Sequence, residues 1–136
     1  MNFIKLIGLS FLILSGHLAA MAQILQPAQW SYEVSKKEAA VGQEVDLIFQ
    51  VTIHPDWYLY SSDFDPDLGP MVTTFTFQQH PSFALVGKIK AVNPKKKFDK
   101  IWGGEYTYFT KNAQFRQRIK ILKPQLSIRG SYEYQV

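Results

Sequence analysis

Three aspartates at alternate positions, Asp63, Asp65 and Asp67, form the first group in this chain that could do chemistry. Hard cations such as Ca²⁺ take carboxylate oxygens from successive positions of one loop. The helix-loop-helix calcium motif also needs a glycine at its sixth position and a glutamate at its twelfth, where this chain has Leu68 and Thr74. That motif is absent, and two interpretations stay open: a looser calcium site, or an acidic turn held by aspartate side chains that bond to the backbone.

Other metal-binding and nucleophilic patterns are missing. His54 and His80 each precede a proline and lie far apart in the sequence, whereas a zinc site needs three or four ligands with defined spacing. No Gly-x-Ser-x-Gly motif occurs, and nothing marks a carboxylate pair for glycoside hydrolysis. The chain has no cysteine, so it cannot perform thiol chemistry by itself. We therefore expect no metal and no cofactor, and identify no catalytic residue within the chain.

Aromatic side chains, which make up 15% of the sequence, are the remaining chemical signal. Tyr58 and Tyr60 lie two positions apart, so in an extended strand both hydroxyls point to the same face. Phe98 and Trp102 lie in a long segment that also holds a run of lysines. By residue type alone, these aromatics are typical of a core or of its rim.

The charge balance argues against a nucleic-acid partner. The chain carries 15 Lys and Arg against 11 Asp and Glu, a net charge of +4. Lysines 95–97 and Lys100 lie beside the aromatic Phe98 and Trp102, a combination that could suit single-stranded nucleic acid. Because the excess charge is small, we favour a solvated loop that keeps the protein soluble.

The elements that must position these residues are short strands. Val45, Leu47, Phe49, Val51 and Ile53 alternate with more polar residues and predict a core strand. Residues 113–121 predict a strand with one polar face in water. Further strands are expected at 30–34, 57–60, 72–78, 83–90, 106–110 and 126–136, with loops at 63–70 and 93–104.

Turn signals about every ten residues predict an all-β fold, an immunoglobulin-like antiparallel β-sandwich, with a small β-barrel as the alternative. Apolar residues alternate from Leu126 to the last residue, Val136, without a stop signal. We therefore expect a sandwich that is incomplete at its C-terminus, and of marginal stability or prone to self-association.

Residues 1–22 have the pattern of a secretory signal peptide. Lys5 precedes an apolar run, and Ala20-Met21-Ala22 offers a cleavage site. The apolar run is much shorter than the roughly 20 residues that span a bilayer, although an uncleaved anchor is the alternative. The expected product is an exported, periplasmic domain of residues 23–136.

Segments along this product resemble the N-terminal periplasmic domain of the thiol:disulfide interchange protein DsbD family. They are QPAQWSYEV, HPDWYLYSSDF, ALVGKIK, FDKIWGGEYTYF and IRGSYEYQV. The resemblance implies an immunoglobulin-like fold that passes electrons from a parent membrane protein to oxidised periplasmic proteins. It also implies a context of protein-disulfide reduction and cytochrome c biogenesis.

The resemblance also suggests where the site lies. It implies a cysteine pair just beyond Val136, so that the chain is inactive alone. Tyr58 and Tyr60 match aromatic positions beside that pair. Ile101-Trp102-Gly103, with Phe98, matches a cap loop that shields the pair, although the family often has an aromatic residue where Ile101 stands.

The partners implied are periplasmic thioredoxin-fold proteins and the parent protein's own thioredoxin-like domain. Contact with a membrane is expected only through a segment that follows Val136. The alternative function is a non-catalytic, exported immunoglobulin-like module that holds a partner through its aromatic loops. The two functions differ in whether a cysteine pair follows the chain.

Overall fold

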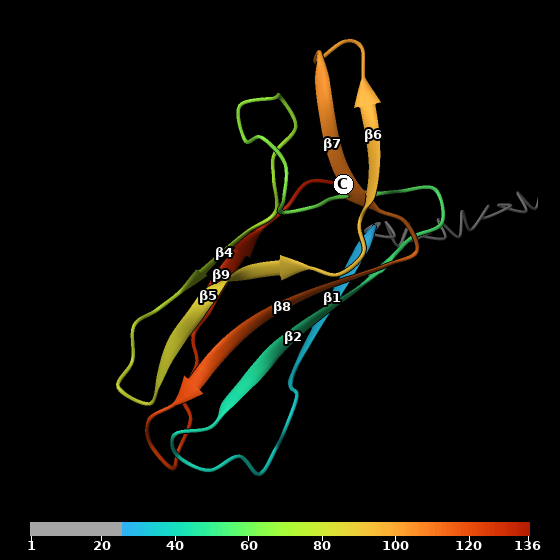
Figure 1. The fold of residues 1–136 in the computed structure, drawn as a ribbon. Coiled ribbons are helices and arrows are strands. Elements are labelled where there is room, and N and C mark those ends of the chain that lie inside the picture. Colours follow the sequence, from blue (N-terminus) through green and yellow to red (C-terminus); the bar gives the residue numbers. More distant parts are fainter. Residues whose placement is uncertain (1–25) are drawn as a thin grey trace, which may run out of the picture.

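The computed structural model describes residues 26–136, and these form strands and connecting loops without a helix (Figure 1). The predicted signal peptide lies outside the described residues. Within them, no helix is long and apolar enough to cross a membrane. The strands are β1 (Ala28–Val34), β2 (Glu44–Ile53), β3 (Leu59–Tyr60), β4 (Thr74–Phe77), β5 (Phe83–Ala91), β6 (Lys95–Asp99), β7 (Gly104–Phe109), β8 (Asn112–Ile121) and β9 (Gly130–Glu133).

The largest sheet has the strand order β1-β2-β8-β5, and every pair in it is antiparallel. The alternating pattern predicted for β2 is confirmed at Val45, Leu47, Val51 and Ile53, which are buried. Phe49 is only half-buried, and Ile48 on the opposite face is buried as well. In β8 the same alternation buries every second side chain, including the fully buried Phe115. These two central strands carry the core of the domain.

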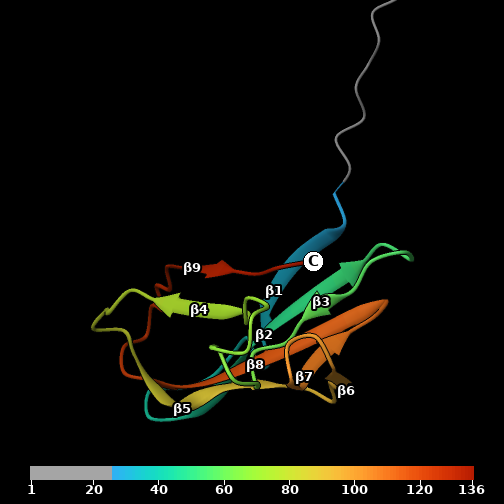
Figure 2. The ribbon, with the colours of Figure 1, turned by 90° about the horizontal axis from the view of Figure 1, so that it is seen from above.

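A second layer covers this sheet. Strands β4 and β9 pair with each other and lie over the large sheet (Figure 2). Aromatic rings fill the space between the layers: Trp30 stacks on Phe115 at 5.9 Å and on Tyr132 at 4.2 Å between ring centroids. Phe75 of β4 contacts both Trp30 and Phe115. Burial of such large rings supplies much of the hydrophobic stabilisation.

The third sheet has the strand order β3-β7-β6, and its β6-β7 hairpin projects from one end of the molecule (Figure 1). Here the sequence-based prediction was wrong, because residues 95–99 are not part of a loop but form β6 in register with β7. Lysines on an edge strand resist pairing with other chains and do not prevent a strand from forming. The run of lysines therefore indicated an edge strand.

The final strand is shorter than predicted. Residues 126–136 were expected to be extended throughout, but β9 covers only Gly130–Glu133, because its partner β4 is itself four residues long. The flanking apolar residues still pack as the alternation predicts. Leu126 and Ile128 contact one core cluster, and Tyr134 and Val136 contact the other.

The fold class is confirmed: the described chain is an antiparallel all-β structure consistent with an immunoglobulin-like sandwich. None of the sheets in residues 26–136 closes on itself, so the alternative of a small barrel is wrong.

Candidate functional site

Four tyrosines and a phenylalanine form a cluster on one face of the β3-β7 pair. Tyr58 and Tyr60 point to the same side, as predicted, and their hydroxyl oxygens are 3.2 Å apart. The ring of Tyr60 lies 5.4 Å from Tyr106 and 6.1 Å from Phe64, and Tyr58 lies 5.7 Å from Tyr108, between centroids. We call these five residues the tyrosine cluster.

Two phenols of the tyrosine cluster, those of Tyr60 and Tyr106, have a raised pKa. Burial raises the pKa of Tyr60 well above its usual range, and the hydrogen bond with Tyr58 raises it further. Burial also raises the pKa of Tyr106, with smaller contributions from Tyr58 and from the carboxylate of Asp99. Tyr60 and Tyr106 therefore present neutral hydroxyls that can donate hydrogen bonds to an anion.

The C-terminal segment runs beside the tyrosine cluster. The backbone N–H of Tyr60 donates to the carbonyl oxygen of Gln135 at 3.1 Å, and the N–H of Met71 donates to the Gln135 side chain at 2.8 Å. Val136 then packs against the core cluster that contains Leu59 of β3. The last described residue thus lies at the base of the projecting hairpin (Figure 1).

The turn between β6 and β7 has a defined conformation. The carboxylate of Asp99 accepts hydrogen bonds from the N–H groups of Ile101 at 2.7 Å and Trp102 at 3.0 Å. The N–H of Gly103 donates to the Asp99 carbonyl at 2.9 Å, and Gly103 has a φ of 73°, which favours glycine. The negative charge of Asp99 also makes a small contribution to the raised pKa of Tyr60 and of Tyr106.

The structure separates the four predicted cap residues into two groups. Trp102 folds back onto the loop of residues 63–70, where its ring lies so close to Gly69 that a Cβ there would overlap it. Gly103 shapes the turn. Ile101 and Phe98 instead extend into solvent, with 91% and 61% of their surfaces exposed. Trp102, rather than Ile101, therefore covers the neighbouring loop.

The loop of residues 63–70 is an acidic turn. The side chain of Asp65 accepts a hydrogen bond from the N–H of Asp67 at 2.9 Å, and the Thr107 hydroxyl donates to the carboxylate of Asp63. The first of these bonds is the aspartate-to-backbone bond that the acidic-turn interpretation predicts, whereas the second joins two side chains. Among residues 26–136, no three His, Cys, Asp or Glu side chains are grouped so that they could hold a metal ion.

Sequence reasoning missed three members of the tyrosine cluster and the glycine under Trp102. Tyr106 and Tyr108 show the same two-residue spacing as Tyr58 and Tyr60, so that signal could have identified them. Phe64 and Gly69 lie in the loop, where no periodic pattern exists.

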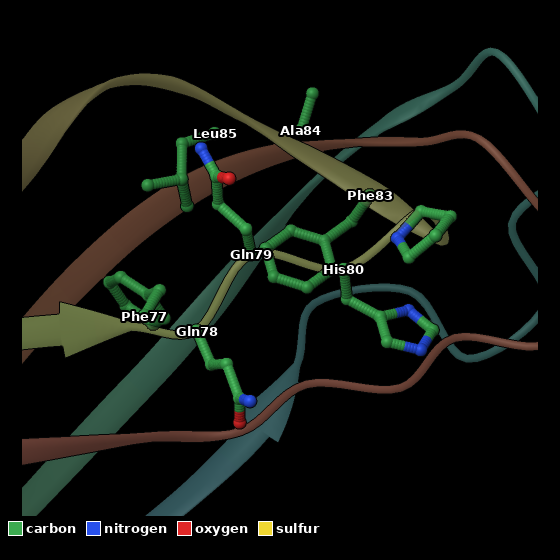
Figure 3. Close-up of a pocket in the computed structure, with 8 residues that line it drawn as sticks. Phe77, Gln78, Gln79, His80, Phe83, Ala84 and Leu85 are labelled. Carbon is green, nitrogen blue, oxygen red and sulfur yellow. The ribbon is translucent and has the colours of Figure 1, made fainter.

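A separate hollow of about 510 Å³ lies at the turn between β4 and β5 (Figure 3). His80 contributes to its wall, and its Nδ1 lies 2.8 Å from the Ser82 hydroxyl. Ser82 is 1% exposed and also bonds to both backbone groups of Ser127. A substrate cannot reach this hydroxyl, so the histidine and the serine connect two segments of the fold and form no catalytic pair.

Comparison with known families agrees with the resemblance noted in the sequence. No curated protein and no solved structure matches the chain. The family model described as "Thiol:disulfide interchange protein DsbD, N-terminal" matches residues 22–136, which include every described strand. The chain therefore belongs to the family of N-terminal domains of the thiol:disulfide interchange protein DsbD.

Proposed function

We propose that this domain passes electrons to oxidised periplasmic proteins by thiol-disulfide exchange, using a cysteine pair that follows Val136 in a longer gene product. Membership of the DsbD family supports the chemistry. One observation supports this location: the backbone bond between Tyr60 and Gln135 brings the last residues of the chain beside the tyrosine cluster.

The exchange proceeds in two balanced steps. A thiolate of the pair attacks one sulfur of the partner's disulfide, which forms a mixed disulfide and releases the partner's other sulfur as a thiolate. The second thiolate of the pair then attacks the mixed disulfide and releases the partner's remaining sulfur. The partner gains two electrons and becomes a dithiol, while the pair becomes a disulfide.

The tyrosine cluster and the β6-β7 turn would support this chemistry in different ways. The neutral hydroxyl of Tyr60 can donate a hydrogen bond to a nearby thiolate, which favours the charged form of the thiol and lowers its pKa. Trp102, packed on Gly69, would limit access to the pair. A partner must then displace the turn before its disulfide can approach.

The partners we propose are exported thioredoxin-fold proteins and a thioredoxin-like domain of the same gene product. The location we propose is the periplasm, reached by means of the signal peptide at residues 1–22.

Trapping of a mixed disulfide tests this function. In the full-length gene product, each cysteine of the pair is changed to serine in turn, and the cells are quenched with acid. One of the two variants should accumulate a disulfide-linked complex with an exported thioredoxin-fold protein, visible on a non-reducing gel. The double variant is the control and should trap nothing.

Two results would contradict the proposal. One is a gene with no in-frame cysteine codons within about ten residues of Val136. The other is a pair whose single variants trap no partner, because a non-catalytic binding module would hold its partner without a covalent bond.

A further inference from the structure

The hairpin formed by β6 and β7 ends in an exposed apolar tip. Ile101 is 91% exposed, Phe98 61% and Trp102 51%. Their turn is held in shape by Asp99, which bonds to the N–H groups of Ile101 and Trp102. Large apolar side chains exposed together on a fixed turn typically mark a binding surface.

Lysines lie along the strand that leads to this apolar tip and in the turn itself. The segment from residue 95 to residue 105 contains four lysines and two acidic residues: Lys95, Lys96, Lys97, Lys100, Asp99 and Glu105. The Asp99 carboxylate accepts hydrogen bonds from two backbone N–H groups of the turn. Glu105 lies 3.8 Å from Lys96, and both side chains are more than half exposed. Such a pair is weak in water, so the tip offers an excess of positive charge.

The tip also extends beyond the large sheet, although Trp102 packs on the loop of residues 63–70. Figure 1 shows β6 and β7 projecting past the large sheet, at the end of the molecule where the C-terminus lies. A broad, flat surface could therefore approach Ile101 without meeting the sandwich. A partner protein would need a shaped pocket, whereas a lipid interface accepts this combination of an aliphatic apex, an indole and lysines without one.

We propose that the hairpin tip docks on an anionic phospholipid bilayer. Ile101 and Phe98 enter the interfacial layer, and the exposed half of the Trp102 ring, which remains packed on Gly69, lies at its edge, where indole rings are favoured. Lys97 and Lys100 attract the negative headgroups, and that attraction weakens as salt screens it. The docking uses the same turn that the proposed function places over the cysteine pair, but the vesicle test needs no cysteine, so the two proposals can fail separately.

Vesicle sedimentation tests this inference with the purified chain. Vesicles of phosphatidylcholine alone are compared with vesicles that contain about 30% phosphatidylglycerol, at low and at high salt. We expect binding to the anionic vesicles, at least roughly tenfold weaker binding to the neutral ones, and release by salt. Lipids brominated on their acyl chains should quench the fluorescence of Trp102, so that a Trp102→Phe variant loses most of the quenching.

Matched variants distinguish binding through the tip from nonspecific binding of the protein to vesicles. Ile101→Ser and the pair Lys97→Gln with Lys100→Gln should each weaken vesicle binding at least about fivefold. Leu85→Ser removes an equally aliphatic side chain, 49% exposed, far from the hairpin and should leave binding unchanged. Substituting glutamine for lysines 36 and 37, between β1 and β2, tests the same loss of charge at another site and should also have little effect.

Three results would overturn the proposal. The first is a wild-type chain that binds neither kind of vesicle, and the second is binding that is equal with and without anionic lipid. The third is a loss of binding in the control variants as large as that in the tip variants. Near-ultraviolet circular dichroism identifies any variant that is misfolded, and in that case the remaining tip variant decides the test. A tip that captures a protein but no lipid would likewise refute it.

Discussion

Replacing Gly69 by alanine tests the contact between the loop of residues 63–70 and Trp102. A Cβ at Gly69 would lie 2.5 Å or less from three atoms of the Trp102 ring, whereas ordinary contact begins at 3.4 Å. The ring must therefore move by about 1 Å or more. Gly69 also has a φ of 148°, a conformation that side chains rarely adopt. Both effects disfavour the folded state of Gly69→Ala.

The two effects have separable magnitudes. A non-glycine residue in such a conformation costs about 1–3 kcal/mol. Gly42→Ala measures this strain alone, because Gly42 has a φ of 90° and a Cβ added there would meet nothing within 4 Å. Displacement of Trp102 should add about 0.5–3 kcal/mol, the usual range for residues in direct contact. Each kcal/mol corresponds to a decrease of roughly 4 °C in the melting temperature of a domain this size.

Urea unfolding of five proteins forms the assay: wild type, Gly69→Ala, Trp102→Ala, the double variant of these two, and Gly42→Ala. The double variant should be more stable than the sum of the single losses predicts, because without the indole the new methyl group meets no ring. Additivity within about 0.5 kcal/mol would refute the packing of Trp102 on Gly69. A loss in Gly69→Ala no larger than in Gly42→Ala would do the same.

Three further predictions concern the core, the turn and the tyrosine cluster. Phe115→Ala should lower the free energy of unfolding by about 3–5 kcal/mol, because the ring is fully buried; a loss under about 1 kcal/mol in urea unfolding would contradict this. Asp99→Ala removes the acceptor of two backbone hydrogen bonds and should accelerate hydrogen exchange at the amides of Ile101 and Trp102; unchanged exchange would argue against the turn described. Burial raises the pKa of Tyr60 in the folded state above the unfolded value near 10. The contribution of the Tyr60 phenol to the free energy of unfolding is therefore complete below about pH 10 and is lost as the pH rises toward the folded pKa. The decline in unfolding midpoint between about pH 10 and 12 should be shallower in Tyr60→Phe, and equal declines would contradict the assignment.

The sequence predicted those parts of the fold that follow from local alternation. In β2, Val45 to Ile53 bury one face because a strand with period two must do so, and the same holds for β8. The face shared by Tyr58 and Tyr60 follows from the same geometry. These predictions needed only the spacing of side chains along one strand.

Contacts between distant segments could not be predicted in this way. Trp102 meets Gly69 because a hairpin and a loop from different parts of the chain converge, and no local pattern encodes that approach. Lys95–Asp99 was taken for a loop because lysine runs and Pro94 are typical of loops, yet pairing with β7 decides its conformation. The bond between Tyr60 and Gln135, on which the proposed site depends, is likewise long-range.

The most direct test of the account is the alkylation rate of the proposed cysteine pair in the reduced full-length protein. If the pair lies beside the tyrosine cluster and under the β6-β7 turn, iodoacetamide should modify it more slowly in the native wild type than in the Trp102→Ala variant, while Leu85→Ser leaves the rate unchanged. A rate that Trp102→Ala does not alter, or a gene product that contains no cysteine to alkylate, would contradict the central claim.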